Sequence, residues 1–166
     1  TFTDALDRLK EKYQIEKVIC VADTGMMNQD NILEVGQNGY EFIFGERLKS
    51  LEQGIQNEIL NRENYQILTI DDTESNDRID IQYYVTGYKK RKLITTYSAK
   101  RAAKDKAERE EKVKKAQAFL NNPSALEKKA RTYFIRKEGQ DQYSLDLEKI
   151  KKSERFDGFL CIATNN

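Results

Sequence analysis

A short apolar run that ends in an aspartate places the strongest constraint on this chain. The run, Lys17 to Ala22, has no internal polar residue and is followed by Asp23-Thr24-Gly25. Such a run is typical of a β-strand that is buried on both faces, as in a parallel or mixed sheet. Residues 28–38 then show helical spacing closed by Gly39, and residues 40–44 are expected as a second buried strand, ended by Gly45. This order of strand, aspartate, loop, helix and strand predicts an α/β core.

The rest of the chain predicts further elements with a different character. Helical patterns cover residues 4–12 and 46–60, and a long helix is expected from Ser98 to about Leu120. Alternation and β-branched residues predict strands over 79–85 and 92–97, β-like segments are expected at 130–136 and 142–147, and residues 156–165 are expected as a buried strand. An α/β start, a charged mixed middle and a final apolar strand together predict a core sheet with a large insertion from about Glu46 to Arg155.

Composition excludes several classes of site. The chain has no histidine and two cysteines, so the usual zinc sites and the Ser-His-Asp and Cys-His triads are excluded. No apolar run is long enough to span a membrane. Cys20 and Cys161 lie within apolar runs, so we expect buried free thiols and a reducing, cytoplasmic location.

Asp23 is the residue in the sequence that most suggests chemistry. A carboxylate at the carboxyl end of a buried strand is held rigidly, beside the crevice where α/β proteins bind ligands. Such a carboxylate suits Mg²⁺, which prefers oxygen ligands. Asp23 could equally serve as the cap of the following helix. An aspartic protease is a third interpretation of Asp-Thr-Gly, but it needs two such loops and this chain has one.

Basic residues gather in the middle of the chain. Between Thr86 and Ala118 there are 12 basic and four acidic residues, a local charge of +8. This stretch is either a phosphate-binding surface or a solvated helix held by i,i+4 ion pairs. The expected pairs are Asp105–Arg109, Glu108–Lys112, Glu110–Lys114 and Glu111–Lys115.

Smaller features have two interpretations each. Arg47 and Lys49 follow the second strand and could reach a phosphate near Asp23 if the two strands are parallel, or could pair with acids of their own helix. The tyrosines of the 79–97 region are expected to be strand and core residues rather than base-stacking platforms. Asp157 precedes Gly158, which favours a turn over a metal ligand.

Five blocks of sequence form an ordered series that covers nearly the whole chain. They are Val18–Met26, Asn31–Leu33, Gly39–Lys49, Tyr97–Glu110 and Phe156–Asn165. Together they resemble the DDE transposases of bacterial insertion sequences, and among these the insertion-sequence-four superfamily. The resemblance implies a partial ribonuclease H-like core over residues 1–45, an inserted α+β subdomain with a long basic helix over 46–155, and a core strand that resumes at 156–166.

The resemblance also implies roles for particular residues. Asp23 matches the second of the family's three catalytic acids and is expected to bind Mg²⁺ or Mn²⁺. The first acid is expected upstream of Thr1, and the third beyond Asn166. Lys100, Arg101 and Lys104 match the family's basic helix and are the expected DNA contacts, joined by Arg47 and Lys49.

The expected function is therefore metal-dependent DNA cleavage and strand transfer by a transposase. The partners would be transposon-end and target DNA, with a possible homodimer of the parent protein. Because two of three acids are missing, we expect the 166 residues alone to be inactive. The alternative function is a non-catalytic DNA-binding or interaction module from a mobile-element remnant.

Overall fold

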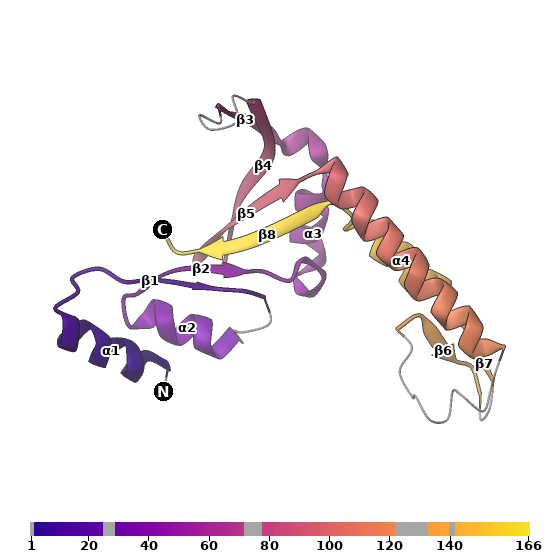
Figure 1. The fold of residues 1–166 in the computed structure, drawn as a ribbon, viewed down its shortest axis with the longest axis horizontal. Helices are drawn as coiled ribbons and strands as arrows, with labels where there is room; N and C mark the ends of the chain where they lie inside the picture. Colours follow the sequence, from indigo (N-terminus) through magenta and orange to yellow (C-terminus); the bar gives the residue numbers. More distant parts are fainter. Residues whose placement is uncertain (1, 25–28, 72–77, 122–132, 140–141) are drawn as a thin grey trace. The chain divides into compact units, whose positions relative to one another are not determined.

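The computed structural model describes residues 2–24, 29–71, 78–121, 133–139 and 142–166. The chain divides into two compact units, which we call unit 1 (Thr1–Tyr97 and Leu160–Asn166) and unit 2 (Ser98–Phe159) (Figure 1). The two units are both formed from helices and strands, so the expected α/β class is confirmed. The subdomain borders expected near residues 46 and 156 stay predictions.

Unit 1 is built on a mixed sheet with the strand order β1-β2-β8-β5-β4-β3. The first two strands are parallel, whereas β2 pairs with β8, and β4 with both β3 and β5, in antiparallel fashion. The strand expected at residues 156–165 forms as β8, and it returns to the sheet beside the second strand. The strands are β1 (Ile19–Ala22), β2 (Glu41–Gly45), β3 (Gln66–Asp71), β4 (Arg78–Tyr88), β5 (Arg91–Tyr97) and β8 (Phe159–Thr164).

The helices of unit 1 follow the predicted positions in part. The helices expected at residues 4–12 and 28–38 are confirmed as α1 (Phe2–Tyr13) and α2 (Gln29–Gln37). Gly39 has a φ of 76°, which is why glycine follows α2. The helix expected over 46–60 is shorter than predicted, because only α3 (Gln53–Leu60) and a 3₁₀ turn at Leu48–Ser50 form there.

One face of the β1-β2-β8 region holds the core of unit 1. Register places Cys20 beside Phe42 and Phe44 beside Ala163, and all four are buried. On the opposite face of β1, Val21 is 73% exposed and Ile19 is exposed too. The prediction that β1 is buried on both faces is therefore wrong. The physical reason is that the described residues pack against only one face of β1.

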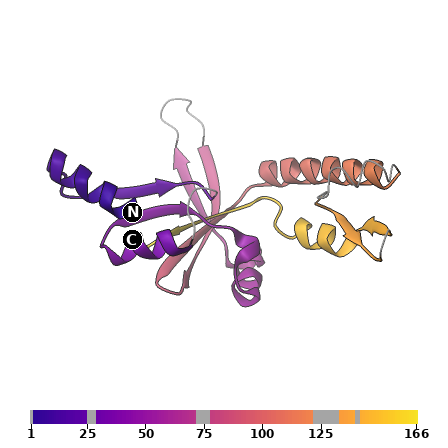
Figure 2. The same ribbon diagram turned by 90° about the horizontal axis from the view of Figure 1, so that it is seen from below.

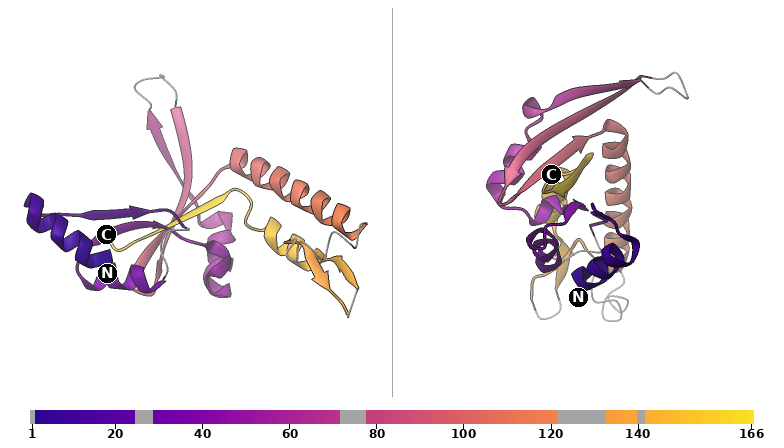
Figure 3. Two further views of the ribbon diagram at one scale, coloured as in Figure 1. Left: turned by 60° about the horizontal axis from the view of Figure 1, so that its bottom comes forward. Right: turned by 90° about the vertical axis from the view of Figure 1, so that its left-hand side faces the viewer.

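The predicted hairpin at residues 79–97 is confirmed as β4 and β5. Their two strands are joined at Lys89 and Lys90, and Lys89 adopts a φ of 57°. Gly87, expected in the turn, instead pairs with Lys92 within the ladder. Figure 3 shows β3 and β4 extending beyond the other strands of unit 1. The polar stretch expected as a loop after Asp71 falls mainly on residues 72–77, which lie outside the described residues.

Unit 2 is dominated by the long helix predicted from Ser98. This helix, α4 (Ala99–Leu120), begins where the Ser98 side chain accepts a hydrogen bond from Arg101 N. Short strands β6 (Ile135–Lys137) and β7 (Tyr143–Leu145) pair antiparallel, and α6 (Leu147–Glu154) follows. Figure 2 shows α6 and the two strands along one side of α4. Residues 130–132 of the first expected strand lie outside the described residues.

Two further expectations concern membranes and thiols. Across the described ranges, every helix is too short or too polar to cross a lipid bilayer. Cys20 and Cys161 are both free and buried, as predicted from their apolar surroundings. Burial raises the pKa of the Cys161 thiol to about 11, so this thiol stays protonated at neutral pH.

Candidate metal site at the end of β1

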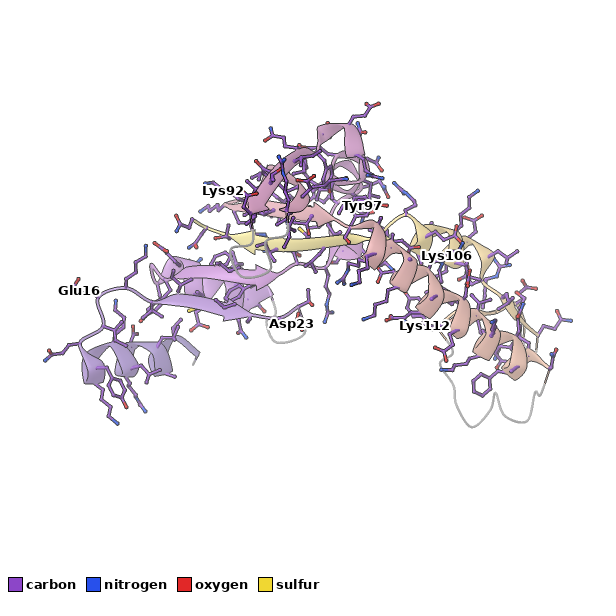
Figure 4. The ribbon with its side chains drawn as sticks, turned by 45° about the horizontal axis from the view of Figure 1, so that its top comes forward. Glu16, Asp23, Lys92, Tyr97, Lys106 and Lys112 are labelled. Atoms are coloured by element: carbon purple, nitrogen blue, oxygen red, sulfur yellow. The ribbon has the colours of Figure 1, made fainter. Side chains whose placement is uncertain are left out.

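Because β1 and β2 are parallel, the segments that follow them begin at the same end of the sheet. Asp23 follows β1 directly, and Glu46 and Arg47 follow β2 at the same end. The Asp23 side chain is exposed to solvent. Figure 4 shows Asp23 at one end of β1 and Glu16 before the other end. The prediction that Arg47 and Lys49 lie near the Asp23 end of the sheet required parallel strands, and β1 and β2 are parallel.

Thr24 holds one oxygen of the Asp23 carboxylate. Asp23 Oδ1 accepts hydrogen bonds from the Thr24 backbone N at 2.7 Å and from Thr24 Oγ1 at 2.9 Å. The backbone hydrogen bond, followed by the hydroxyl, holds the pKa of Asp23 below its usual value. The carboxylate is therefore ionised at neutral pH. Its second oxygen, Oδ2, receives no hydrogen bond from the described residues.

The helix-cap interpretation of Asp23 gains no support from these contacts. A cap would accept hydrogen bonds from the first backbone N–H groups of α2. The hydrogen bonds to Asp23 within the described residues come from Thr24 instead. The helix after the loop also differs from the strand-rich surroundings that an aspartic protease requires.

Gly45 sets the position of Thr24 from the neighbouring strand. A Cβ on Gly45 would lie 2.7 Å from Thr24 N and 3.0 Å from Thr24 Cγ2. Real Cβ atoms do not approach backbone this closely, so only glycine allows the end of β2 to lie against Thr24. Gly45 thereby supports the hydrogen bonds that orient Asp23.

The other charged residues at this edge have separate roles. Glu46 is turned into the protein, where its Oε2 lies 2.7 Å from Arg91 Nη2. Arg47 and Lys49 are exposed and accessible to a phosphate. Across the described residues, no group of three or more metal-binding side chains lies together. Among the described residues, Asp23 is thus a lone candidate ligand rather than part of a complete cluster.

The three predicted DNA-binding residues of unit 2 lie in the first turns of α4. Lys100, Arg101 and Lys104 are all exposed. Arg101 Nε lies 3.7 Å from Asp105, and Lys104 Nζ lies 3.8 Å from Glu108. Exposed pairs of this length are weak and can exchange for a phosphate. The side chains of Lys100, Arg101 and Lys104 are therefore accessible to a DNA phosphate. The same contacts also fit a solvated helix face that binds no DNA.

The expected ion pairs of α4 form with different partners in most cases. Glu111–Lys115 is confirmed at 3.4 Å. The other observed pairs run in the opposite direction, from a base to an acid four residues later: Arg101–Asp105, Lys104–Glu108 and Lys106–Glu110. Asp105 also accepts a hydrogen bond from Gly158 N, and Arg109 pairs with other acids.

Arg109 is the residue of α4 that departs most from the expected basic surface. Its side chain is buried, and Nη1 binds both carboxylate oxygens of Asp157. Arg109 Nε also lies 3.7 Å from Glu154 Oε1. Arg109 therefore joins α4 to α6 and to the turn after it. The role of Asp157 in the fold is to pair with Arg109. Residues 155–158 also form turns, as expected for Asp157-Gly158.

The tyrosines of the hairpin lie in strands, as predicted. Tyr84 Oη binds Glu58 and Tyr88 Oη binds Glu52 at 3.1 Å, so both join the sheet to the segment that contains α3. The Arg62 guanidinium stacks 3.8 Å from the centre of the Tyr97 ring. These contacts occupy the tyrosine side chains within unit 1.

Sequence reasoning missed the part played by Thr24. The signal was present in Asp-Thr-Gly, because a hydroxyl residue directly after an aspartate can bond its carboxylate. The role of Gly45 depends on the approach of a neighbouring strand, which no local pattern contains.

The chain was compared with protein-family models, curated proteins and solved structures, and none of the three comparisons found a match.

Proposed function

We propose that this chain is part of the catalytic domain of a DDE-type DNA transposase, in which Asp23 is one of the metal ligands. The observation that carries the proposal is an exposed, ionised carboxylate at the carboxyl end of a parallel strand pair. The ribonuclease H-like core and the cytoplasmic location belong to the same proposal. The core is supported by the order of the five sequence blocks, together with a mixed sheet that the final strand rejoins. The location is supported by the two buried free thiols, Cys20 and Cys161.

The residues at Asp23 fit one part of the coordination shell of a divalent ion. Mg²⁺ is bound by one or two carboxylates and keeps several waters or substrate phosphates. Thr24 holds Oδ1, and among the described residues Oδ2 accepts no hydrogen bond, so Asp23 would bind a metal ion through that single oxygen. A pair of such ions would activate the attacking oxygen and stabilise the leaving oxygen of a phosphoryl transfer. The remaining acids would come from outside these 166 residues.

Exposed bases supply the contacts to DNA in this proposal. Arg47 and Lys49 follow β2 in unit 1, and Lys100, Arg101 and Lys104 begin α4 in unit 2. Lysine and arginine bind phosphates without regard to sequence, and this binding weakens steeply with salt. We therefore expect weak, nonspecific duplex binding by this chain and no cleavage, since one carboxylate holds a metal ion only loosely.

A second candidate function is a DNA-binding or interaction module without catalysis. The observation that favours it is the absence, among the described residues, of any cluster of three metal-binding side chains. The two candidates differ in what Asp23 binds. If the chain is part of a transposase, Asp23 binds a divalent ion. If the chain is a binding module without catalysis, no metal binding at Asp23 is expected.

Metal-induced broadening in NMR spectra distinguishes the two candidates. Mn²⁺ added to the ¹⁵N-labelled chain should broaden the amide signals of Thr24 and Gly45, and excess Mg²⁺ should restore them. Asp23→Asn should abolish the effect. The matched control is Glu16→Gln, which removes an exposed acid before the opposite end of β1 and should change nothing. Broadening that survives Asp23→Asn, or none at all, would overturn the metal-ligand role.

A further inference from the structure

Unit 1 contains a pocket of about 440 Å³ that the proposed transposase function does not use. It lies between α2, the start of β2 and the β4–β5 turn. Ile32, Leu33 and Phe42 line its apolar side, and Lys89, Lys90 and Arg91 line its basic side. Pockets of ~300–1,000 Å³ with an apolar wall and a few polar groups are typical of small-molecule sites.

The pocket lies at the opposite end of the parallel strands from Asp23. Phe42 is near the start of β2, and its backbone N donates to Asn165 Oδ1 at 2.9 Å. Asn165 Nδ2 donates in turn to Tyr40 O at 2.9 Å, so this side chain joins the ends of two strands. Asp23 follows the end of β1 instead. The phosphate-binding part of the pocket, at the β4–β5 turn, therefore lies apart from Asp23, although the Arg91–Glu46 ion pair reaches from the pocket to the residue after Gly45.

The basic side of the pocket has more cations than nearby acids. Lys89 lies 3.7 Å from Glu52, and Arg91 Nη2 lies 2.7 Å from Glu46. In the described part of the chain, Lys90 has no ion pair, and the buried Nε of Arg91 has no acceptor. Three cations thus face two carboxylates. The carboxyl end of α2 contributes about half a negative charge, which is too little to cancel the remaining positive charge.

The apolar side of the pocket is open because of a glycine. Gly36 lines the pocket on α2, and a Cβ there would have only Phe42 Cε1 near it, at 3.7 Å. Leu33, on the same helix, is exposed to solvent. Burying its side chain under a ligand would be favourable, because the transfer of apolar surface out of water lowers the free energy. The ligand should therefore combine an apolar body with a negative group.

We propose that this pocket binds an organic phosphate monoester, with its phosphate at Lys89 and Lys90 and its apolar body against Ile32, Leu33 and Gly36. A phosphate monoester carries nearly two negative charges at neutral pH, which matches two adjacent lysines better than a carboxylate does. Nucleoside monophosphates and alkyl phosphates share this chemistry. They differ in whether the apolar body is flat or aliphatic.

NMR titration of the whole chain tests the pocket. The probes are adenosine 5′-monophosphate, hexyl phosphate, adenosine and inorganic phosphate. At least one monoester should shift the amide signals of residues 32–37 and 89–91 to saturation, and the tighter one identifies the source. Adenosine and inorganic phosphate should each bind at least about tenfold more weakly. Equal shifts with inorganic phosphate, or no saturable shift with either monoester, would overturn the proposal.

Variants separate a defined pocket from general attraction to basic residues. Lys89→Ala/Lys90→Ala should weaken monoester binding by about tenfold. Lys92→Ala removes a neighbouring exposed cation that does not line the pocket, and it should have little effect. Gly36→Leu should block binding by filling the apolar side, whereas the fold is retained because Leu is favourable in a helix. Equal losses in the Lys92 and Lys89/Lys90 variants would contradict a defined site.

Discussion

A side chain at Gly45 would collide with Thr24, because a Cβ there would lie 2.7 Å from the Thr24 backbone nitrogen. The same Thr24 nitrogen donates to Asp23 Oδ1. The end of β2 therefore determines where the carboxylate after β1 stands. The candidate metal site depends on a backbone contact between two parallel strands as well as on the acid itself.

Gly45→Ala is expected to disturb both stability and metal binding. Overpacking of this kind costs about 1–3 kcal/mol, because backbone must move to make room. Urea unfolding should show this loss, and Mn²⁺ broadening around Asp23 should weaken. The control is Gly54→Ala, because Gly54 lies in α3 with no atom within 4 Å of its added Cβ. If Gly45→Ala proves as neutral as Gly54→Ala, the close approach to Thr24 does not constrain the site.

Thr24→Val should raise the pKa of Asp23 toward its ordinary value. The variant keeps the shape of the side chain and the backbone hydrogen bond but removes the hydroxyl that donates at 2.9 Å. Because hydrogen bonds to the charged form lower the pKa of a carboxyl group, losing one raises it. Carboxyl ¹³C shifts followed against pH would give the pKa directly. Thr24→Ser, which retains the hydroxyl, should leave the pKa low; an unchanged pKa in Thr24→Val would contradict this role.

Asp157→Ala is expected to destabilise unit 2. It would leave the Arg109 guanidinium buried, with Glu154 as its remaining ion-pair partner among the described residues. Removing one partner of a buried pair costs about 3–5 kcal/mol, and partial exposure of Asp157 favours the lower end. Hydrogen exchange of α4 amides would report the loss. Lys112→Ala, on the exposed surface of the same helix, should change stability by less than about 0.5 kcal/mol. Equal effects of the two variants would show that the ion pair contributes little.

Duplex DNA binding should depend on the first turns of α4. Replacing Lys100, Arg101 and Lys104 by alanine should flatten the plot of log K against log salt, with each lost phosphate contact changing the slope by about 0.9. Lys112, Lys114 and Lys115 provide a matched triple substitution further along the same helix. Fluorescence anisotropy across a series of salt concentrations measures both slopes. Should the two triple variants behave alike, the basic surface acts as a diffuse charge and no particular turn of α4 contacts DNA.

Stability should fall at alkaline pH because of Cys161. Desolvation raises its pKa from 9.0 to about 11, so the folded state holds the proton more tightly than the unfolded state does. The contribution is present below pH 9.0 and is lost as the pH rises toward 11. Unfolding in urea at several pH values should show this decline. Cys161→Ala should show a shallower decline, and an identical slope in the two proteins would exclude the thiol as its cause.

Local signals predicted the elements that form from local interactions. Ser98 and the long run of good helix formers predicted α4, and alternation predicted the pairing of β4 with β5. The sequence interpretation omitted β3, whose residues are mostly exposed and which pairs along one edge only. It also omitted α6, although Asp146 caps that helix by accepting a hydrogen bond from Lys149 N.

Features that depend on distant segments could not be predicted. The run at β1 indicated a strand, but whether its second face is covered depends on what packs there, and Val21 is exposed. Spacing predicted Asp105 as the partner of Arg109, whereas the fold brings Asp157 to it from 48 residues away. Asp23 itself was found from its position after an apolar strand, while its support by Gly45 required the pairing of β1 and β2.

The central claim is that Asp23 Oδ2 binds a divalent metal ion, and anomalous diffraction from crystals soaked in Mn²⁺ tests it most directly. The account predicts an anomalous peak about 2.2 Å from Asp23 Oδ2, at the distance typical of hard cations and carboxylate oxygen. The peak should be absent from crystals of Asp23→Asn. Peaks confined to other carboxylates, with none at Asp23, would contradict the assignment of this residue as a metal ligand.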